Sequence, residues 1–243
     1  MNPKVEKDNT VVVFDIRNFS AHRYLLGKKS GGGTLLTNLV IHILNDTVKI
    51  VKSKEKEFPN KKHDFLNHTG DGFVLIIRGK HSPLVALLCI SELRNQANIR
   101  IANYQQDMKE KFAETEKKLP RLGFGIGAHS GIVVDIVFDN FGTPVGGGVG
   151  VLGSSINIAS RVEQCTKDHD CNVIFTHALL KRVQEIIPAE HQNNFNRFWS
   201  PLGKHRLRGI DETFRLFDFE PEPDKPIFHE TWKTWRENRI QSP

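Results

Sequence analysis

The chain has 243 residues and a net charge of +6, with 38% hydrophobic, 9% aromatic and 26% charged residues. These fractions are typical of a globular protein with a packed core, and they exclude collagen-like, disordered and miniprotein classes. The 34 Lys and Arg against 28 Asp and Glu favour a phosphate-rich ligand or nucleic acid as partner without requiring either. The length suffices for one large domain or two small ones.

In the first half of the chain, the hydrophobic pattern predicts strands and helices in alternation. A β-branched strand at Thr10–Ile16 leads into a helix that Asn18 or Ser20 caps, and a second helix covers Leu35–Val51. A Gly-Asp-Gly turn then joins two strands of a hairpin, and a long helix follows. These three elements cover His63–Asn67, Phe73–Ile77 and Pro83 to about Lys118.

The second half predicts further strands and helices before a short tail. The elements are two short strands around Ser130-Gly131 within Phe124–Val137, a loop over Asp139–Gly150, a helix over Ser154–Thr166 capped by Ser154 or Ser155, a strand at Val173–Phe175, a helix over Leu179–Ile187 that Pro188 ends, and strands at His205–Arg208 and Phe214–Phe219. Because the hairpins add antiparallel pairs, we expect the α+β class. One domain covers residues 1–220. In the tail, 221–243, Phe228–Ile240 predicts a helix with Trp232, Trp235 and Arg239 on one face. Such a stripe packs on the parent domain or on a dimer mate, and binding of a separate partner is the alternative.

Cysteine content and apolar stretches bear on location. The three cysteines, Cys89, Cys165 and Cys171, cannot all pair within the chain and match no zinc spacing, so reduced thiols are the simplest interpretation. The N-terminal residues contain no apolar region of a signal peptide. The longest apolar stretch, Pro83–Ile90, is far shorter than the roughly 20 residues that span a bilayer. We therefore expect a cytoplasmic chain with no membrane segment.

Two carboxylates stand where predicted strands end. Asp15 follows the first strand, and Asp71 lies in the hairpin turn. Taken singly, each has an ordinary explanation as a turn residue or helix cap. Adjacent strands would bring both to one sheet edge, where two oxygen ligands suit Mg²⁺ or Mn²⁺ if a nucleotide supplies the rest. The backbone N–H groups of Ile16 to Ser20 then form an anion site at a helix start.

A third element is the helix with Asn157 and Arg161, four residues apart and thus on one face. A solvated surface is the plain alternative for such a face. The surrounding small residues favour close approach to a ligand or another backbone instead. Arg161 is suited to neutralise charge on a phosphoryl oxygen, and Asn157 to orient a sugar oxygen.

Five motifs in order resemble those of class III nucleotidyl cyclases, and the resemblance runs from about Val11 to Phe219. The motifs are FDIRNFS at 14–20, TGDGF at 69–73, GIGAHSG at 125–131, GSSINIASRVE at 153–163 and LRGI at 207–210. The resemblance implies a mainly antiparallel sheet with a ferredoxin-like βαβ core and flanking helices. It also implies a head-to-tail homodimer with composite active sites.

The resemblance also implies the roles of individual residues. Asp15, the Ile16 backbone and Asp71 hold two Mn²⁺ or Mg²⁺ ions on one chain. Asn157 and Arg161 come from the other chain and stabilise the transition state. In the remaining substrate-binding positions, Ile16, Asn18, Phe19 and Ser20 surround the phosphates, and Arg208 replaces the usual phosphate-binding Lys.

The chemistry that follows is cyclisation of a nucleoside triphosphate. The ribose 3′-OH attacks the α-phosphorus, pyrophosphate leaves in line, and a 3′,5′-cyclic monophosphate remains. No protein nucleophile is required. We therefore interpret His22, His68 and His129, which lie near the motifs, as structural.

Two positions depart from the purine cyclases. Asn67 stands four residues before Asp71, where the family carries Lys for adenine or Glu for guanine, and Gly150 stands where adenylate cyclases carry Asp. The neutral amide of Asn67 can pair with the N3–H and O4 edge of uracil or, flipped, with cytosine. The glycine-rich loop at Gly150 lets backbone approach the base.

A compact cyclase with such a base pocket resembles the pyrimidine cyclases of bacterial Pycsar anti-phage systems. That resemblance implies conversion of UTP to cyclic UMP, which a separate cyclic-nucleotide-binding effector reads. UTP is favoured over CTP because uridylate cyclases predominate in that group. A cytidylate cyclase making cyclic CMP and a divergent adenylate cyclase are the alternatives.

Three other classes of protein compete with these. A catalytically silent nucleotide sensor would have no need of Asp15, Asp71, Asn157 and Arg161 together. A nucleic-acid binder is suggested by the Lys-rich stretch at 49–62, but no zinc finger, helix-turn-helix or aromatic-rich strand motif accompanies it, so we expect no nucleic-acid partner. A diguanylate cyclase has a turn similar to this Gly-Asp-Gly-Phe sequence. It differs by a second Gly before the carboxylate, which this chain lacks.

Overall fold

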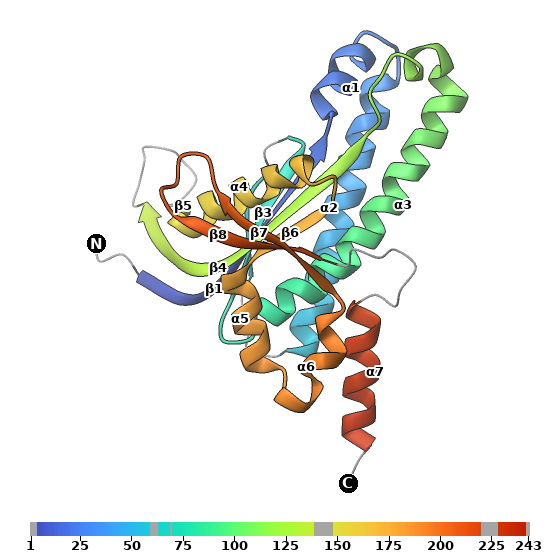
Figure 1. The fold of residues 1–243 in the computed structure, drawn as a ribbon. Helices are drawn as coiled ribbons and strands as arrows, with labels where there is room; N and C mark the ends of the chain where they lie inside the picture. The colour runs from blue at the N-terminus through green and yellow to red at the C-terminus, as the bar shows by residue number, and fades with distance from the viewer. Residues whose placement is uncertain (1–3, 59–62, 69, 139–147, 220–227, 242–243) are drawn as a thin grey trace.

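A computed structural model of the 243-residue chain describes residues 4–58, 63–68, 70–138, 148–219 and 228–241 (Figure 1). Within these ranges eight strands form one sheet in the order β2-β3-β1-β4-β6-β8-β7, with β5 paired to β4. All pairs are antiparallel except β4 with β6. The strands are β1 (Lys4–Arg17), β2 (His63–His68), β3 (Gly72–Arg78), β4 (Gly123–Phe138), β5 (Gly148–Leu152), β6 (Val173–Thr176), β7 (Trp199–Arg206) and β8 (Thr213–Phe219). The expected α+β class with a mainly antiparallel sheet is confirmed.

Helices cover both faces of the sheet, because β1 alternates its buried side chains between them. Phe14 and Ile16 join the large core formed with α2 and α3, whereas Val11 and Val13 pack with Ala159 of α4. The helices are α1 (Phe19–Leu26), α2 (Gly32–Glu57), α3 (Ser82–Glu116), α4 (Ser154–Asp168), α5 (His177–Ile186), α6 (Ala189–Asn196) and α7 (Phe228–Gln241). Figure 1 shows α2 and α3 side by side, with α4 across the sheet from them.

Four predicted elements need correction. The two short strands expected around Ser130-Gly131 are one strand, β4, because Ser130 Oγ bonds Thr10 Oγ1 of β1 at 2.8 Å and pairing continues past the glycine. Pro188 does more than end a helix: it is the N-cap of α6, which the sequence pattern did not predict. The expected strand at His205–Arg208 begins earlier and ends at Arg206. Of the expected loop over Asp139–Gly150, residues 148–150 belong to β5 and 139–147 lie outside the described ranges.

The expected helix caps are partly different. At α1, Asn18 is the N-cap residue as expected, in the left-handed region with φ 64°, but its Nδ2 donates to Arg121 O at 2.8 Å and its side chain makes no capping hydrogen bond. At α4, the N-cap is Gly153, and Ser155 Oγ donates to Ile132 O of β4 at 2.8 Å. Both side chains therefore fix a helix start to the β4 region of the fold.

Helix α2 has a property that the apolar stretches of the sequence did not indicate. Its segment Gly32–Lys54 is long and apolar enough, by length and composition only, to cross a membrane. The same segment contributes Leu36, Leu39 and Ile43 to the core that it forms with α3. A core helix passes such a test, and the expected absence of a membrane segment stays a prediction.

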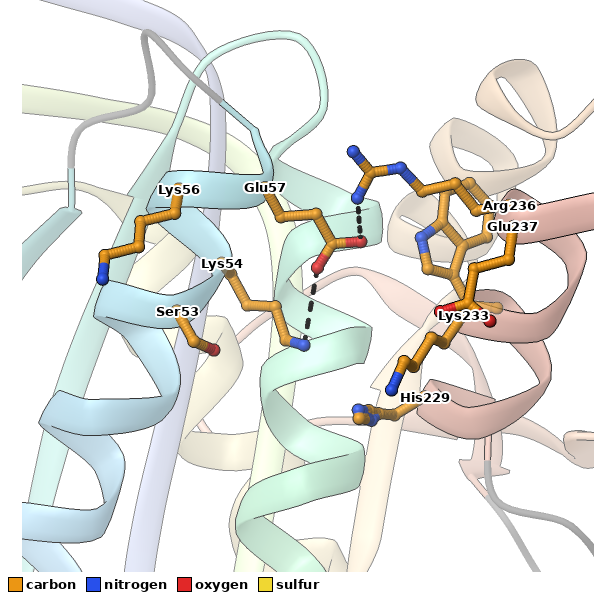
Figure 2. A pocket seen from close by; sticks show the side chains of 9 residues that line it. Ser53, Lys54, Lys56, Glu57, His229, Lys233, Arg236 and Glu237 are labelled. Carbon is orange, nitrogen blue, oxygen red and sulfur yellow. Dashed lines mark ion pairs between the residues drawn. The ribbon is translucent and has the colours of Figure 1, made fainter. Parts of the chain in front are cut away.

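Helix α7 contacts α2 and α3 through ion pairs (Figure 2), and its Trp232 packs on Phe195 of α6 and on Phe58 at the end of α2. Arg236 Nη1 lies 2.7 Å from Glu57 Oε1, and Lys54 Nζ lies 3.6 Å from Glu57 Oε2. His229 Nε2 and Lys54 Nζ both contact Glu92 Oε1, at 2.8 and 2.5 Å. The expected packing of this helix on the parent domain is confirmed, while the division into 1–220 and 221–243 stays a prediction.

We expect Trp232→Ala to lower the free energy of unfolding by about 3–5 kcal/mol, as for other buried large-to-small substitutions. Trp232 is 6% exposed, and its ring lies 6.1 Å from that of Phe195 and 4.7 Å from that of Trp235. Urea unfolding followed by circular dichroism measures the change. Lys233→Ala, on the exposed side of the same helix, is the matched control with a change below about 0.5 kcal/mol. Equal stability of the two variants would contradict this packing role.

Candidate active site

Pairing of β1 with β3 brings Asp15 and Asp71 to one edge of the sheet. Asp15 lies opposite Gly72, and the Ile16 N–H donates to Asp71 O at 3.1 Å. A Cβ on Gly72 would lie 3.3 Å from Asp15 Oδ1 and only 2.3 Å from Phe14 O, so glycine leaves the room beside the carboxylate. The structure thus brings together the two carboxylates that the sequence pattern pairs, and their role as metal ligands stays a prediction.

The electrostatics of this edge favour a cation. Burial and then the charge of Asp71 raise the pKa of Asp15 to about 6, while the charges of Lys167 and Arg17 act to lower it. A desolvated carboxylate beside a second one gains most from a positive ion.

A cavity of about 500 Å³ opens beside Asp71 at the start of α1. Its lining residues are Phe19, Ser20, Arg23, Tyr24, Gly70 and Asp71. The first turn of α1 contains no acidic side chain and no side-chain cap, so its first N–H groups stay available to an anion. Arg23 and Tyr24 lie outside the residues that the sequence motifs predict for the site. Helical spacing could have indicated them, because they follow Ser20 by three and four residues and so share its face of the helix.

These residues fit a divalent cation accompanied by phosphate. Asp15 and Asp71 offer the oxygen ligands that Mg²⁺ and Mn²⁺ prefer. Among the residues with described side chains, no group of three or more His, Cys, Asp and Glu could hold a metal ion by itself. The remaining ligands would come from a nucleotide, from water or from backbone.

Asn157 and Arg161 lie on the face of α4 that points away from the sheet. Asn157 is exposed, and Arg161 Nη1 donates to Gln164 Oε1 on the same helix at 2.8 Å. Arg161 and Glu163 are separated by about 200° around the helix axis, and Glu163 is the one buried against the sheet. Within one chain the structure therefore does not bring Arg161 to Asp15.

The predicted base and phosphate residues are spread over other elements. Asn67 belongs to β2, with its side chain outside the described part of the structure. Gly150 pairs with Ile136 near the far end of β4 from Gly125, the partner of Asp15. Arg208 is exposed in the turn between β7 and β8.

Two of the three histidines near the motifs have interior partners. His22 Nδ1 contacts the Tyr104 hydroxyl and its Nε2 contacts Pro120 O, both at 2.8 Å. His129 Nδ1 lies 2.9 Å from Thr176 Oγ1, and burial lowers the pKa of His129 to about 4. A neutral, hydrogen-bonded ring in each place agrees with a structural role.

Glu163 is a buried acid to which the sequence pattern assigned no role. It is 4% exposed, and its Oε1 has no hydrogen-bond partner. Burial and then the charge of Asp15 raise the pKa of Glu163 to about 7, while the charges of Lys167 and Arg17 act to lower it. The motif GSSINIASRVE contained this residue, but only the packing of α4 on β4 places it near Asp15.

Comparison with known proteins agrees with the fold. No family model matches the chain. An adenylate cyclase from Anabaena cylindrica is 35% identical over 65 residues, which are 27% of this chain and 12% of that protein. Sequence similarity therefore covers a small part of either protein.

Solved structures match over most of the chain. The adenylyl cyclase CyaB from P. aeruginosa has a TM-score of 0.63 at 16% identity, covering 93% of this chain and all of that one. A bacterial light-regulated adenylyl cyclase has a TM-score of 0.62 at 16% identity, covering 99% of this chain and 58% of that one. The guanylate cyclase domain of RhGC from Catenaria anguillulae, in complex with GTP, has a TM-score of 0.50 at 16% identity, covering 88% and 96%. The chain therefore has the fold of the class III nucleotidyl cyclase catalytic domains.

Proposed function

We propose that the protein is a cytoplasmic nucleotidyl cyclase that converts UTP to cyclic UMP and pyrophosphate. The observation that carries the cyclase assignment is the pairing of Asp15 and Asp71 at one sheet edge, beside a cavity at the uncapped start of α1. An acidic edge binds cations, and a helix start binds phosphate. Their juxtaposition suits a metal-bound nucleoside triphosphate.

The mechanism assigns each group one task. Two divalent ions, when bound at Asp15, the Ile16 backbone and Asp71, would lower the pKa of the ribose 3′-OH and neutralise phosphate charge. The N–H groups of Phe19 and Ser20 bind phosphate oxygens at the start of α1. Arg161 stabilises the charge that develops on the α-phosphoryl oxygens, and Asn157 orients the ribose.

A second copy of the chain completes this site. Arg161 faces away from the sheet of its own chain, on the opposite side of α4 from the buried Glu163. Asn157, one turn earlier on the same outward face, is exposed. Side chains that face outward in this way are available to the carboxylates of another protomer, which supports a head-to-tail homodimer.

We expect UTP to be cyclised at least 100-fold faster than ATP or GTP, and faster than CTP. Asn67 and Gly150 stand where purine cyclases carry charged base-reading groups, and a buried hydrogen-bonding pair discriminates by a few kcal/mol. The assay is competition among the four triphosphates at equal concentration with Mn²⁺, resolved by mass spectrometry. Asn67→Ala is expected to blur the choice of base while leaving Mn²⁺ binding unchanged.

The outcome of this competition separates the remaining candidates. Dominant cyclic CMP would indicate a cytidylate cyclase, and dominant cyclic AMP a divergent adenylate cyclase. No cyclic product with intact nucleotide binding would indicate a silent nucleotide sensor. The proposed biological role, second-messenger production in bacterial antiviral defence with a separate cyclic-nucleotide-binding effector, depends on a pyrimidine product.

A further inference from the structure

The cross-strand neighbours of Asp15 are glycines on both sides. Gly72 of β3 and Gly125 of β4 both pair with it. Paired residues of antiparallel strands point their side chains to the same face, with Cβ positions about 4.5–5.5 Å apart. The carboxylate of Asp15 therefore stands in a gap with no side chain from either neighbouring strand.

Glu163 of α4 fills the β4 side of this gap. A Cβ on Gly125 would lie 2.2 Å from Glu163 Oε1, and a Cβ on Gly127 would lie 2.2 Å from the Glu163 backbone N. The two glycines thus let α4 approach the strand until the Glu163 carboxylate takes the place of a Gly125 side chain. That place is one strand spacing from the Asp15 side chain.

Glu163 Oε1 is a buried carboxylate oxygen that no nearby cation neutralises through a hydrogen bond. Arg17 and Lys167 are the nearby cations, but Arg17 Nη2 donates to Cys171 O at 2.6 Å, and Glu163 Oε1 has no hydrogen-bond partner. A buried carboxylate oxygen without a partner is costly in a chain that binds nothing. Cation binding at Asp15 would offset that cost.

We propose that Glu163 is a positioning residue of the metal site, which strengthens cation binding at Asp15 from outside the direct ligands. This inference rests on the proposed function. Direct ligation is not part of it, because the described side chains contain no cluster of three that could hold a metal ion. Groups that lie around metal ligands and act through them typically change metal affinity by 10- to 100-fold when mutated.

The test is a titration of the nucleotide-free protein with Mn²⁺ at pH 8, with free Mn²⁺ followed by electron paramagnetic resonance. We expect Glu163→Gln to weaken Mn²⁺ binding about tenfold. The melting temperature of the metal-free variant is expected to be equal to or above that of the wild type, because a neutral amide replaces a buried charge of similar shape. Glu163→Asp is expected to restore part of the affinity.

Opposite signs of the two effects distinguish this role from a structural one. The matched control is Asp168→Asn, which removes an exposed carboxylate from the same helix and is expected to leave Mn²⁺ binding unchanged. Wild-type affinity in Glu163→Gln, or a lower melting temperature with affinity lost in proportion, would overturn the inference alone. If the wild type binds no Mn²⁺, or Asp15→Asn binds it equally well, the proposed metal site fails and the inference with it.

Discussion

Replacing Asp15 with asparagine is expected to reduce cyclic-nucleotide formation by at least about 10³-fold, or about 4 kcal/mol of transition-state stabilisation. Asparagine keeps the size of the side chain but removes the charge that a divalent ion needs beside Asp71. Burial already raises the pKa of Asp15 to about 6, so the metal-free variant is expected to fold at least as stably as the wild type. Loss of activity would then be chemical in origin.

The measurement is release of pyrophosphate and of cyclic product with saturating Mn²⁺, alongside a thermal melt of the same preparation. Asp107→Asn, a substitution at a half-exposed position of α3 that pairs with Lys111, is the control for a general effect of removing a carboxylate. Turnover of Asp15→Asn above a tenth of the wild-type rate would be incompatible with metal ligation by this residue.

Mixing two inactive variants, Asp71→Asn and Arg161→Ala, is expected to restore activity to about a quarter of the wild-type level. In a two-fold symmetric dimer each site takes its carboxylates from one chain and Arg161 from the other. At equal concentrations about half of the dimers are mixed, and each mixed dimer has one intact site. The measurement is turnover after chain exchange, with exchange itself followed by native mass spectrometry.

The matched control is a mixture of Asp15→Asn with Asp71→Asn. Both substitutions affect the same half of the composite site, so every site in every mixed dimer lacks one carboxylate and no activity should return. Activity in this control, or none in the first mixture despite proven exchange, would argue against a site shared between two chains.

Local sequence pattern was sufficient for the parts of the fold that depend on neighbouring residues. The continuous β-branched run of β1 and the Gly-Asp-Gly turn before β3 place Asp15 and Asp71 at strand ends, and antiparallel pairing then brings them together. The sequence pattern gave the wrong prediction where contacts between distant residues determine the structure. The Ser130-Gly131 pair looks like a break, yet β1 on one side and Ser155 of α4 on the other hold β4 as one strand.

The candidate site shows the same division. The motif around Asn157 and Arg161 predicts a helix with both side chains on one face, and α4 has that form. Nothing in the spacing of Glu163 indicates that it lies beside Asp15, because that contact depends on how closely Gly125 and Gly127 let the helix approach the strand. The lining of the α1 cavity by Arg23 is likewise a property of the folded chain.

Because Asp15 and Glu163 are both desolvated, a bound cation would stabilise the folded state as well as take part in catalysis. The pKa of Asp15 rises from 3.8 to about 6 and that of Glu163 from 4.5 to about 7, so the folded metal-free chain holds these protons more tightly than the unfolded chain. Its stability therefore falls as pH rises from about 4 to 7. A cation that binds the ionised form of Asp15 in the folded state alone adds about 2.7 kcal/mol at a hundredfold excess over its Kd. The supply of divalent cation would thus govern how long the chain survives unfolding and proteolysis, independently of how fast it turns over nucleotide.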